Sequence, residues 1–243
     1  MSIPVIATMP KKVLIIIPCY NEENSLPLVL TELGNIIMPD DYAMSIAVIN
    51  DCSKDNTATV AKQYNVILLD LPMNLGIGGA VQTGIKYAMN NNFDIAIQLD
   101  GDGQHPPGEI IKLLNAHQSF GADIIIGSRF IDNEGFQSSL VRRMGIRYFY
   151  RLNKIFTGNN IFDSTSGFRL LNKRTIAIAA NNYPDDYPEP ESLVIFAKAG
   201  LSIKEVPVNM RARLGGVSSI NHSASLFYTL KVSIGMLFSF IRN

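Results

Sequence analysis

Two carboxylates stand where the sequence could hold a metal ion. Asp100 and Asp102 lie two residues apart, directly after the apolar run 95–99, which predicts a buried strand. Side chains two apart in an extended chain lean to the same side, and the glycines that follow each acid permit a tight turn. With Gln104 as a neutral oxygen ligand, this set suits Mg²⁺ or Mn²⁺ carrying a diphosphate. Because the pattern is short, the competing interpretation is an acidic turn that caps the helix after Pro106-Pro107.

A second candidate is a basic stripe on a helix predicted over residues 140–156. Arg143, Arg147 and Arg151 recur every four residues and therefore share one face. Three aromatic residues, 148–150, are interleaved with them. Such a face suits a clamp on a phosphate group at a membrane surface. A solvated helix face is the alternative.

A third candidate is the segment 210–219, which predicts a basic loop. Arg211 and Arg213 precede Gly215-Gly216 there. This arrangement suits a lid that closes over a diphosphate. An ordinary surface loop is the alternative.

The elements that position these residues alternate along the first half of the chain. Short apolar runs predict strands at 13–17, 45–49, 66–69, 95–99 and 122–127, with helices between them, among them one over about 80–90 and one over about 108–117. Such alternation predicts a doubly wound parallel α/β sheet, in which ligands lie beyond the carboxyl ends of the strands. The polar residues that follow these ends are Tyr20-Asn21-Glu22, Asp51, Asn74 and the Asp100/Asp102 pair.

Composition bounds the class of protein. The chain has 243 residues, of which 47% are hydrophobic and 17% charged, so a substantial folded core is predicted. A formal net charge of zero argues against nucleic acid as a partner. Cys19 and Cys52 are isolated, which predicts neither a disulfide framework nor a Cys-rich metal site and fits a reducing cytosol. Residues 1–12 lack the apolar core of a signal peptide.

The segment 223–241 carries a single charge, Lys231. A spanning helix needs about 20 mainly apolar residues, and the interspersed serines and threonine favour an amphipathic helix lying on a membrane or against a partner. A core helix is the alternative. The predicted organisation is one domain over 1–220 and an amphipathic helix over 221–243.

In their order along residues 13–220, the motifs resemble family 2 glycosyltransferases of the GT-A fold, nearest to the branch of dolichyl-phosphate mannose synthase and bacterial polyprenyl-phosphate glycosyltransferases. The matching segments are 17–22 (Ile-Pro-Cys-Tyr-Asn-Glu), 48–55 (Val-Ile-Asn-Asp-Cys-Ser-Lys-Asp), 74–76 (Asn-Leu-Gly), 98–107 (Gln-Leu-Asp-Gly-Asp-Gly-Gln-His-Pro-Pro), 127–130 (Gly-Ser-Arg-Phe) and 163–169 (Asp-Ser-Thr-Ser-Gly-Phe-Arg). The resemblance implies a mostly parallel, Rossmann-like sheet with helices on both faces. It favours metal binding over capping for the acidic turn.

The resemblance also implies a nucleotide site at the strand ends, where base and ribose contact the first two strand tips. The implied nucleotide-binding residues are Pro18, Tyr20, Asn21, Glu22, Asp51, Asn74, Asp100 and Gly101. The segment Asn50-Asp51-Cys52-Ser53 has one acid fewer than the common Asp-Asp-Gly-Ser pattern. The base is therefore left open among UDP-, GDP- and dTDP-linked sugars.

The implied chemistry is an inverting displacement at the sugar's C1, with Asp102, Arg129 and Glu189 as catalytic residues. Asp100, Asp102 and Gln104 are the implied ligands of Mg²⁺ or Mn²⁺, which neutralises the leaving diphosphate. Arg129 and Arg143 are the implied acceptor-phosphate pair. Arg147, Arg211 and Arg213 complete the set of predicted phosphate contacts.

Glu189 separates two kinds of acceptor. A hydroxyl acceptor needs a general base, whereas a lipid phosphate is already an anion and needs none. Glu189 lies where many family members carry the catalytic carboxylate. Its alternative role, shared with Glu191, is to cap a helix predicted from about Ser192.

Three functions follow from these observations. The first is transfer of a sugar from a nucleotide sugar to polyprenyl phosphate, by an enzyme peripheral on the cytoplasmic face of the membrane. The second is extension of a cell-surface glycan at a hydroxyl, with Glu189 as base. The third is a non-catalytic nucleotide-sugar-binding subunit, against which the paired acids and Arg129 weigh. A homo-oligomer is included among the predicted partners.

Overall fold

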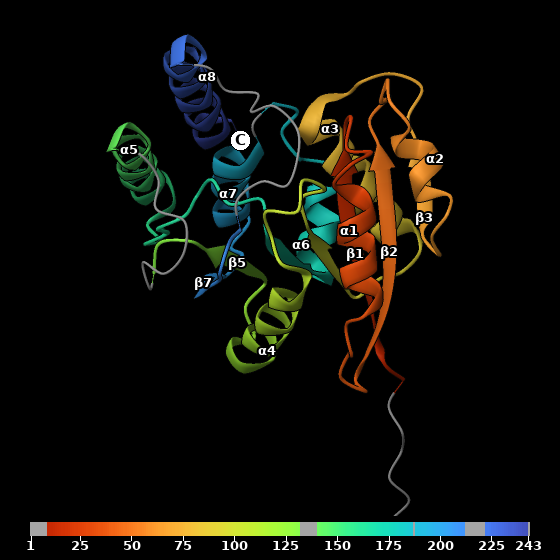
Figure 1. Cartoon of the computed structure of the whole chain (residues 1–243). Coiled ribbons are helices and arrows are strands. Elements are labelled where there is room, and N and C mark those ends of the chain that lie inside the picture. The colour runs from red at the N-terminus through yellow and green to blue at the C-terminus, as the bar shows by residue number, and fades with distance from the viewer. Residues whose placement is uncertain (1–8, 132–139, 187, 212–221, 243) are drawn as a thin grey trace, which may run out of the picture.

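One seven-stranded sheet organises the molecule, in the strand order β3-β2-β1-β4-β6-β5-β7 (Figure 1). The structure is a computed structural model that describes residues 9–131, 140–186, 188–211 and 222–242. The strands are β1 (Lys11–Cys19), β2 (Tyr42–Asn50), β3 (Ile67–Asp70), β4 (Ile95–Gln98), β5 (Ile124–Ser128), β6 (Arg169–Asn172) and β7 (Ile203–Pro207).

Helices cover both faces of this sheet, as the alternation of strands and helices predicts. The helices are α1 (Leu26–Gly34), α2 (Thr57–Ala61), α3 (Gly76–Asn90), α4 (Ile110–Phe120), α5 (Leu140–Thr157), α6 (Lys173–Ala179), α7 (Pro188–Lys198) and α8 (His222–Ile241), with a 3-10 turn at Pro107–Glu109. One buried cluster joins the sheet to α1 and α4, and another joins it to α3, α6 and α7. The central strand β1 is buried on both faces from Val13 onward, which explains its unbroken apolar run.

The exception to the parallel arrangement is β6. It runs antiparallel between β4 and β5, with Arg169 opposite both Gln98 and Ile126. The sheet is therefore mostly rather than wholly parallel. Because β6 begins where β4 and β5 end, the segment 163–168 that precedes it reaches the same edge as Asp100. The residue types of 163–169 predict a polar turn entering an extended piece, but they do not indicate the direction of the strand.

Helices α5 and α8 pack on α7 at one side of the sheet. Phe149 of α5, Val194 of α7, and Val232 and Met236 of α8 form a third buried cluster, and Figure 1 shows the three helices grouped at one side of the molecule. Within the described residues, no helix is long and apolar enough to cross a membrane. The predicted C-terminal helix is present as α8. Large apolar side chains also lie on its exposed side: Leu230, Ile234, Leu237, Phe238, Phe240 and Ile241.

Three predicted boundaries need correction. The helix expected from Ser192 begins at Pro188, because proline fits the first turn of a helix, where no N–H partner is needed. Glu189 therefore lies in the first turn of α7 rather than in the preceding loop. The helix expected from Ala80 begins at Gly76, and the one expected from Gly108 begins as a 3-10 turn and becomes α4 at Ile110.

Candidate active site

The loops after β1 and β2 are joined by hydrogen bonds into one wall of the site. Asn21, with a φ of 58°, receives a hydrogen bond from the Lys54 amide at 2.8 Å and donates its own amide to Ser53 Oγ at 3.0 Å. The Glu22 amide donates to Thr57 Oγ1 at 2.8 Å. Asparagine tolerates the left-handed region better than most residues, which explains its place at this bend. The half-exposed Tyr20 lies beside these contacts, at the carboxyl end of β1.

Asp51, directly after β2, connects these loops to the start of α3. It is buried, its Oδ1 accepts the Leu75 amide at 2.7 Å, and its backbone carbonyl accepts the Asn74 side-chain amide at 3.1 Å. These bonds tie the end of β2 to the start of α3. They occupy one carboxylate oxygen of Asp51. The predicted nucleotide residues Asp51 and Asn74 are thus brought together.

The acidic turn follows β4 and packs directly against β1. A side chain at Gly101 would place its Cβ 2.8 Å from Cys19 Sγ and 3.3 Å from the Pro18 carbonyl oxygen, so only glycine fits there without rearrangement. The backbone amide of Gln104 donates to Asp102 Oδ1 at 3.0 Å, which closes the turn. Asp102 is buried. The turn therefore follows β4, as the sequence predicts, and it packs against the end of β1.

Asp100 has a buried histidine behind it. His105 Nδ1 lies 3.4 Å from Asp100 Oδ2, and the imidazole stacks on Phe168 with ring centroids 5.1 Å apart. Burial raises the pKa of Asp100, and the nearby Asp102 charge raises it further while His105 and Arg129 oppose it. Burial lowers the pKa of His105, which favours the neutral imidazole. The neutral imidazole of His105 therefore packs behind Asp100, a position that its place in the sequence does not indicate.

Arg129 is held by a carboxylate from a distant segment. Its Nε and Nη2 donate to the two oxygens of Asp163 at 2.6 Å each, and its backbone amide donates to Asp163 Oδ2 at 3.0 Å. Nη2 also donates to Thr165 Oγ1 at 2.8 Å. Burial alone would lower the pKa of Arg129, but the Asp163 charge outweighs it and the pKa is raised. This bidentate pair fixes the plane of the guanidinium.

Glu189 lies within electrostatic range of both Asp100 and Arg129. It is half-buried in the first turn of α7. Burial raises the pKa of Glu189, and the positive charge of Arg169 opposes that rise. Asp100, Arg129 and Glu189, which come from three different parts of the chain, therefore lie near enough for their charges to affect one another.

Arg169 connects the segment before β6 to α7. Its fully buried guanidinium donates to the carbonyl oxygens of Ser166 and Ser164 at 2.7 and 2.9 Å, and to Ser192 Oγ at 2.9 Å. Burial lowers the pKa of this guanidinium, and the carboxylate of Glu189 is among the charges that oppose the shift. Arg169 thus sets the distance between the segment that holds Arg129 and the helix that carries Glu189.

The oxygen set at the acidic turn fits a divalent cation that also binds phosphate. Among the residues described, no three His, Cys, Asp or Glu side chains are grouped as a metal site of their own. Mg²⁺ ordinarily takes only one or two carboxylates and completes its octahedron with substrate phosphates and water. Asp100 and Asp102 supply two carboxylates in one turn, and Gln104 adds an amide oxygen. The donor chemistry therefore matches the predicted ion.

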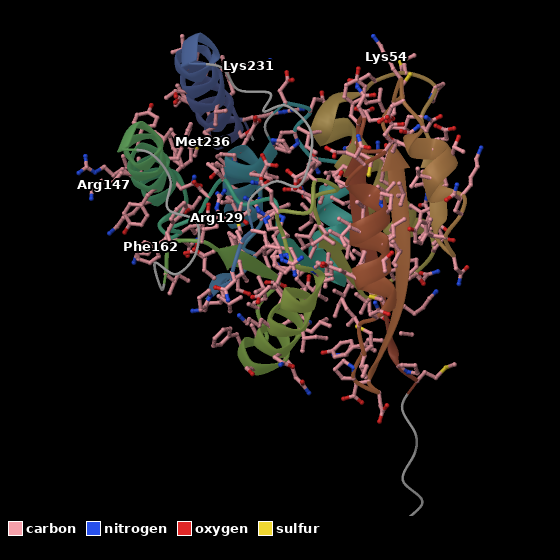
Figure 2. The ribbon with its side chains drawn as sticks, viewed as in Figure 1. Lys54, Arg129, Arg147, Phe162, Lys231 and Met236 are labelled. Atoms are coloured by element: carbon pink, nitrogen blue, oxygen red, sulfur yellow. The ribbon has the colours of Figure 1, made fainter. Side chains whose placement is uncertain are left out.

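The other predicted cations are distributed differently. Arg147 is exposed on α5 and points away from Arg129 in Figure 2. Arg211 donates from Nη1 to Glu32 Oε1 at 2.7 Å, while its backbone amide donates to the Gln104 carbonyl at 2.9 Å. The side chain of Arg143 and the whole of Arg213 lie outside the described residues. In this structure Arg211 is thus held on α1, next to the predicted metal site.

A cavity of about 330 Å³ opens beside Arg129, between α4 and the ends of β5 and β7. Lys112 and Asn115 line it from α4, and Asn209 lines it from the segment after β7. None of these three residues belongs to a motif that predicts a role. Asp163 and Arg169 do lie in a motif, 163–169, but their roles were not predicted either, because nothing local in the sequence identifies the partner of a buried charge.

Comparison with known proteins identifies the family that this chain matches. A family model described as "Glycosyl transferase family 2" matches residues 14–177. The undecaprenyl-phosphate mannosyltransferase of Micrococcus luteus is 30% identical over 222 residues, which cover 86% of this chain and 88% of that protein. The UDP-N-acetylglucosamine–dolichyl-phosphate N-acetylglucosaminyltransferase of Methanococcus voltae is 30% identical over 218 residues, covering 82% and 85%.

Solved structures share the fold at lower identity. Glucosyl-3-phosphoglycerate synthase from Mycobacterium tuberculosis, in a complex with Mn²⁺ and UDP, superposes with a TM-score of 0.66 at 17% identity, covering 95% of this chain and 80% of that one. Mannosyl-3-phosphoglycerate synthase from Rubrobacter xylanophilus gives a TM-score of 0.69 at 12% identity, covering 94% and 74%. The predicted architecture is therefore confirmed.

Proposed function

Because the chain belongs to glycosyl transferase family 2 and has the GT-A fold, we propose that it moves a sugar from a nucleoside diphosphate to polyprenyl phosphate. A non-catalytic role is set aside, since the family is one of glycosyltransferases. Two relatives with similar coverage are named for a polyprenyl-phosphate acceptor, dolichyl or undecaprenyl phosphate. The observation in this chain that supports the proposal best is Arg129, a positively charged fork held in place by Asp163.

The donor occupies the edge formed by the ends of β1, β2 and β4. Asp51, Asn74 and the loop of Tyr20 to Glu22 hold the base and ribose, and Asp100 and Asp102 face the diphosphate. A bound Mg²⁺ or Mn²⁺ supplies Lewis acidity for the departing diphosphate. The side chains of Asp100, Asp102 and Gln104 would hold it. A panel of donors, each tested with each metal, decides which of the two metals and which base are used.

The acceptor phosphate approaches from the side of Arg129. Its oxygen attacks C1 of the sugar, the bond from C1 to the diphosphate oxygen breaks, and the configuration inverts. The attacking phosphate is an anion at neutral pH, so no proton has to be removed. Arg129 attracts and orients this anion, while Asp163 keeps the guanidinium from rotating. Arg143, Arg147, Arg211 and Arg213 are the further phosphate contacts that we propose, Arg211 after release from Glu32.

The membrane side of the enzyme is formed by α5 and α8. The exposed apolar side chains of α8, together with Tyr148 and Ile155 of α5, suit contact with lipid. Tyr148 and Ser233 Oγ share a hydrogen bond of 2.8 Å, which joins the two helices. We place the enzyme as a peripheral protein on the cytoplasmic face, where a lipid phosphate reaches Arg129 from these helices.

Transfer to a glycan hydroxyl is the second candidate. The raised pKa of Glu189 favours it, because a base with a raised pKa is better matched to neutral pH. The two candidates make opposite predictions for Glu189→Gln.

The test uses purified protein with a panel of UDP-, GDP- and dTDP-sugars, Mn²⁺ or Mg²⁺, and either a polyprenyl phosphate or an oligosaccharide acceptor. Product on the lipid phosphate, with Glu189→Gln keeping turnover within about threefold of wild type, supports the proposal. Product only on the oligosaccharide, lost in Glu189→Gln, overturns it in favour of the second candidate. Thermal shift with each nucleotide sugar, which rises with the logarithm of ligand concentration over Kd, identifies the base independently.

A further inference from the structure

A carboxylate on the edge strand holds the backbone that carries Asp163. Glu205 lies on β7, and its Oε2 and Oε1 accept the backbone amides of Phe162 and Asp163 at 2.7 and 2.8 Å. Each carboxylate oxygen therefore receives one of two consecutive N–H groups. Bonds of this kind, with one charged partner, are roughly twice as strong as those between neutral groups.

Asp163 and Glu205 lie close together although both are acids. Asp163 is fully buried and Glu205 is half-buried, and the negative charge of Asp163 raises the pKa of Glu205 in addition to the larger effect of burial. The unfavourable pair is stable because each acid has its own donors. Asp163 takes the guanidinium of Arg129, and Glu205 takes the two amides. Glu205 therefore acts on Arg129 through the Phe162–Asp163 backbone.

The same short segment also reaches α5. The Phe162 ring stacks on Tyr150 with centroids 5.3 Å apart and planes 15° from parallel. Figure 2 shows Phe162 at the same side of the molecule as Arg129 and α5. The backbone that Glu205 holds is thus fastened at one end to a helix of the proposed membrane side and at the other to the counterion of Arg129.

We propose that Glu205 is a positioning residue for acceptor recognition: it fixes the Phe162–Asp163 backbone so that Asp163 holds the Arg129 guanidinium in the plane needed for a phosphate. This inference rests on the proposed function, since it takes Arg129 as the acceptor-phosphate residue. It goes further because it assigns an effect on acceptor affinity to Glu205 of β7, which acts through the Phe162–Asp163 backbone rather than on a substrate directly.

Glu205→Gln is the sharpest variant. A glutamine keeps the size but has a single acceptor oxygen, and its NH₂ group would face the second backbone N–H, donor against donor. Asp94→Asn is the matched control, because Asp94 Oδ2 also accepts a backbone amide, from Lys12 at 3.0 Å, but at the amino end of the central strand β4. We expect Glu205→Gln to raise the acceptor KM by about tenfold, with donor KM within about twofold, and Asp94→Asn to change neither.

A structural measurement makes the test independent of the acceptor. In ¹⁵N-labelled protein, the Arg129 Nε–H signal, assigned by its loss in Arg129→Lys, should be sharp and protected from exchange in wild type and in Asp94→Asn. It should broaden or disappear in Glu205→Gln. Hydrogen exchange of the Phe162 and Asp163 amides in the wild-type protein requires no variant, and both should be protected well beyond an exposed loop.

The outcomes separate the two proposals. An unchanged Arg129 signal in Glu205→Gln, or rapid exchange of both amides in wild type, overturns the role of Glu205 whatever the enzyme's acceptor is. Loss of the signal together with a selective rise in acceptor KM supports it. Loss of the signal in a protein whose wild type transfers nothing to polyprenyl phosphate supports the positioning role and overturns the proposed function instead.

Discussion

The proposed donor side and the proposed acceptor side of this site are built in different ways. The donor side uses the ends of neighbouring parallel strands, so Asp51 and Asp100 lie at the same edge of the sheet because β2 and β4 both pair with β1 in parallel. The acceptor side joins Arg129 after β5, Asp163 before an antiparallel strand, and Glu205 on an edge strand. The first arrangement follows from the topology alone. The second depends on specific contacts between segments distant in sequence, and it should therefore be the easier one to disturb selectively.

Loss of a carboxylate at the acidic turn should give the largest effect. We expect Asp102→Asn to reduce transfer by at least about 100-fold, because the metal's charge stabilisation is worth several kcal/mol. The Mn²⁺-dependent part of the thermal shift with nucleotide should vanish as well. Binding and turnover near wild type would show that the donor side does not work through this residue.

A change at Arg129 should weaken acceptor binding without weakening donor binding. Arg129→Lys keeps the charge but loses the planar fork that binds Asp163 and phosphate. The acceptor KM should rise by about 10- to 100-fold, while the nucleotide-dependent thermal shift stays as in wild type. An equal loss of donor and acceptor binding would mean that the site is one cooperative unit rather than two.

The packing of the acidic turn gives an intermediate effect on stability. Gly101→Ala places a methyl group 2.8 Å from Cys19 Sγ and should destabilise the fold by about 1–3 kcal/mol, as overpacking does. Adding Cys19→Ala removes the sulfur and should recover part of that loss. Urea unfolding of the two single variants and the double variant measures the coupling. Strictly additive costs would contradict the close contact between β1 and the turn.

The smallest effect is expected from the charge on Glu189. Burial is the main reason why the pKa of Glu189 is raised in the folded protein. The protonated carboxyl group is therefore favoured in the folded state. Its contribution to the free energy of unfolding is highest at low pH and falls as pH rises through the folded-state pKa, because the buried group must then ionise at a cost. Glu189→Gln has no such cost. Its melting temperature should match wild type near pH 4 and exceed it increasingly towards pH 8. A change of 1 kcal/mol corresponds to about 2–4 °C in a chain of this size. A gap that is constant with pH would show that the carboxylate is not desolvated.

The same contrast explains what could be predicted from the sequence. The strands β1 to β4 are apolar runs that are followed by polar residues. These runs alone predict that Asp51, Asn74 and Asp100 lie at one edge of the sheet. The direction of β6 could not be predicted, because a four-residue strand carries no mark of its neighbours. Asp163, Arg169 and Glu205 were therefore not predicted as supports of the site. Their roles depend on contacts 23 to 42 residues away in sequence.

The most direct test of the central claim is the position of the metal in a crystal grown with Mn²⁺ and the nucleoside diphosphate that gives the largest thermal shift. We predict an anomalous Mn²⁺ peak about 2.0–2.3 Å from an Asp102 oxygen, bridging the diphosphate, with the Arg129 guanidinium still paired to Asp163 on the sugar side. A diphosphate bound away from Asp100 and Asp102, or a Mn²⁺ peak ligated elsewhere, would contradict it.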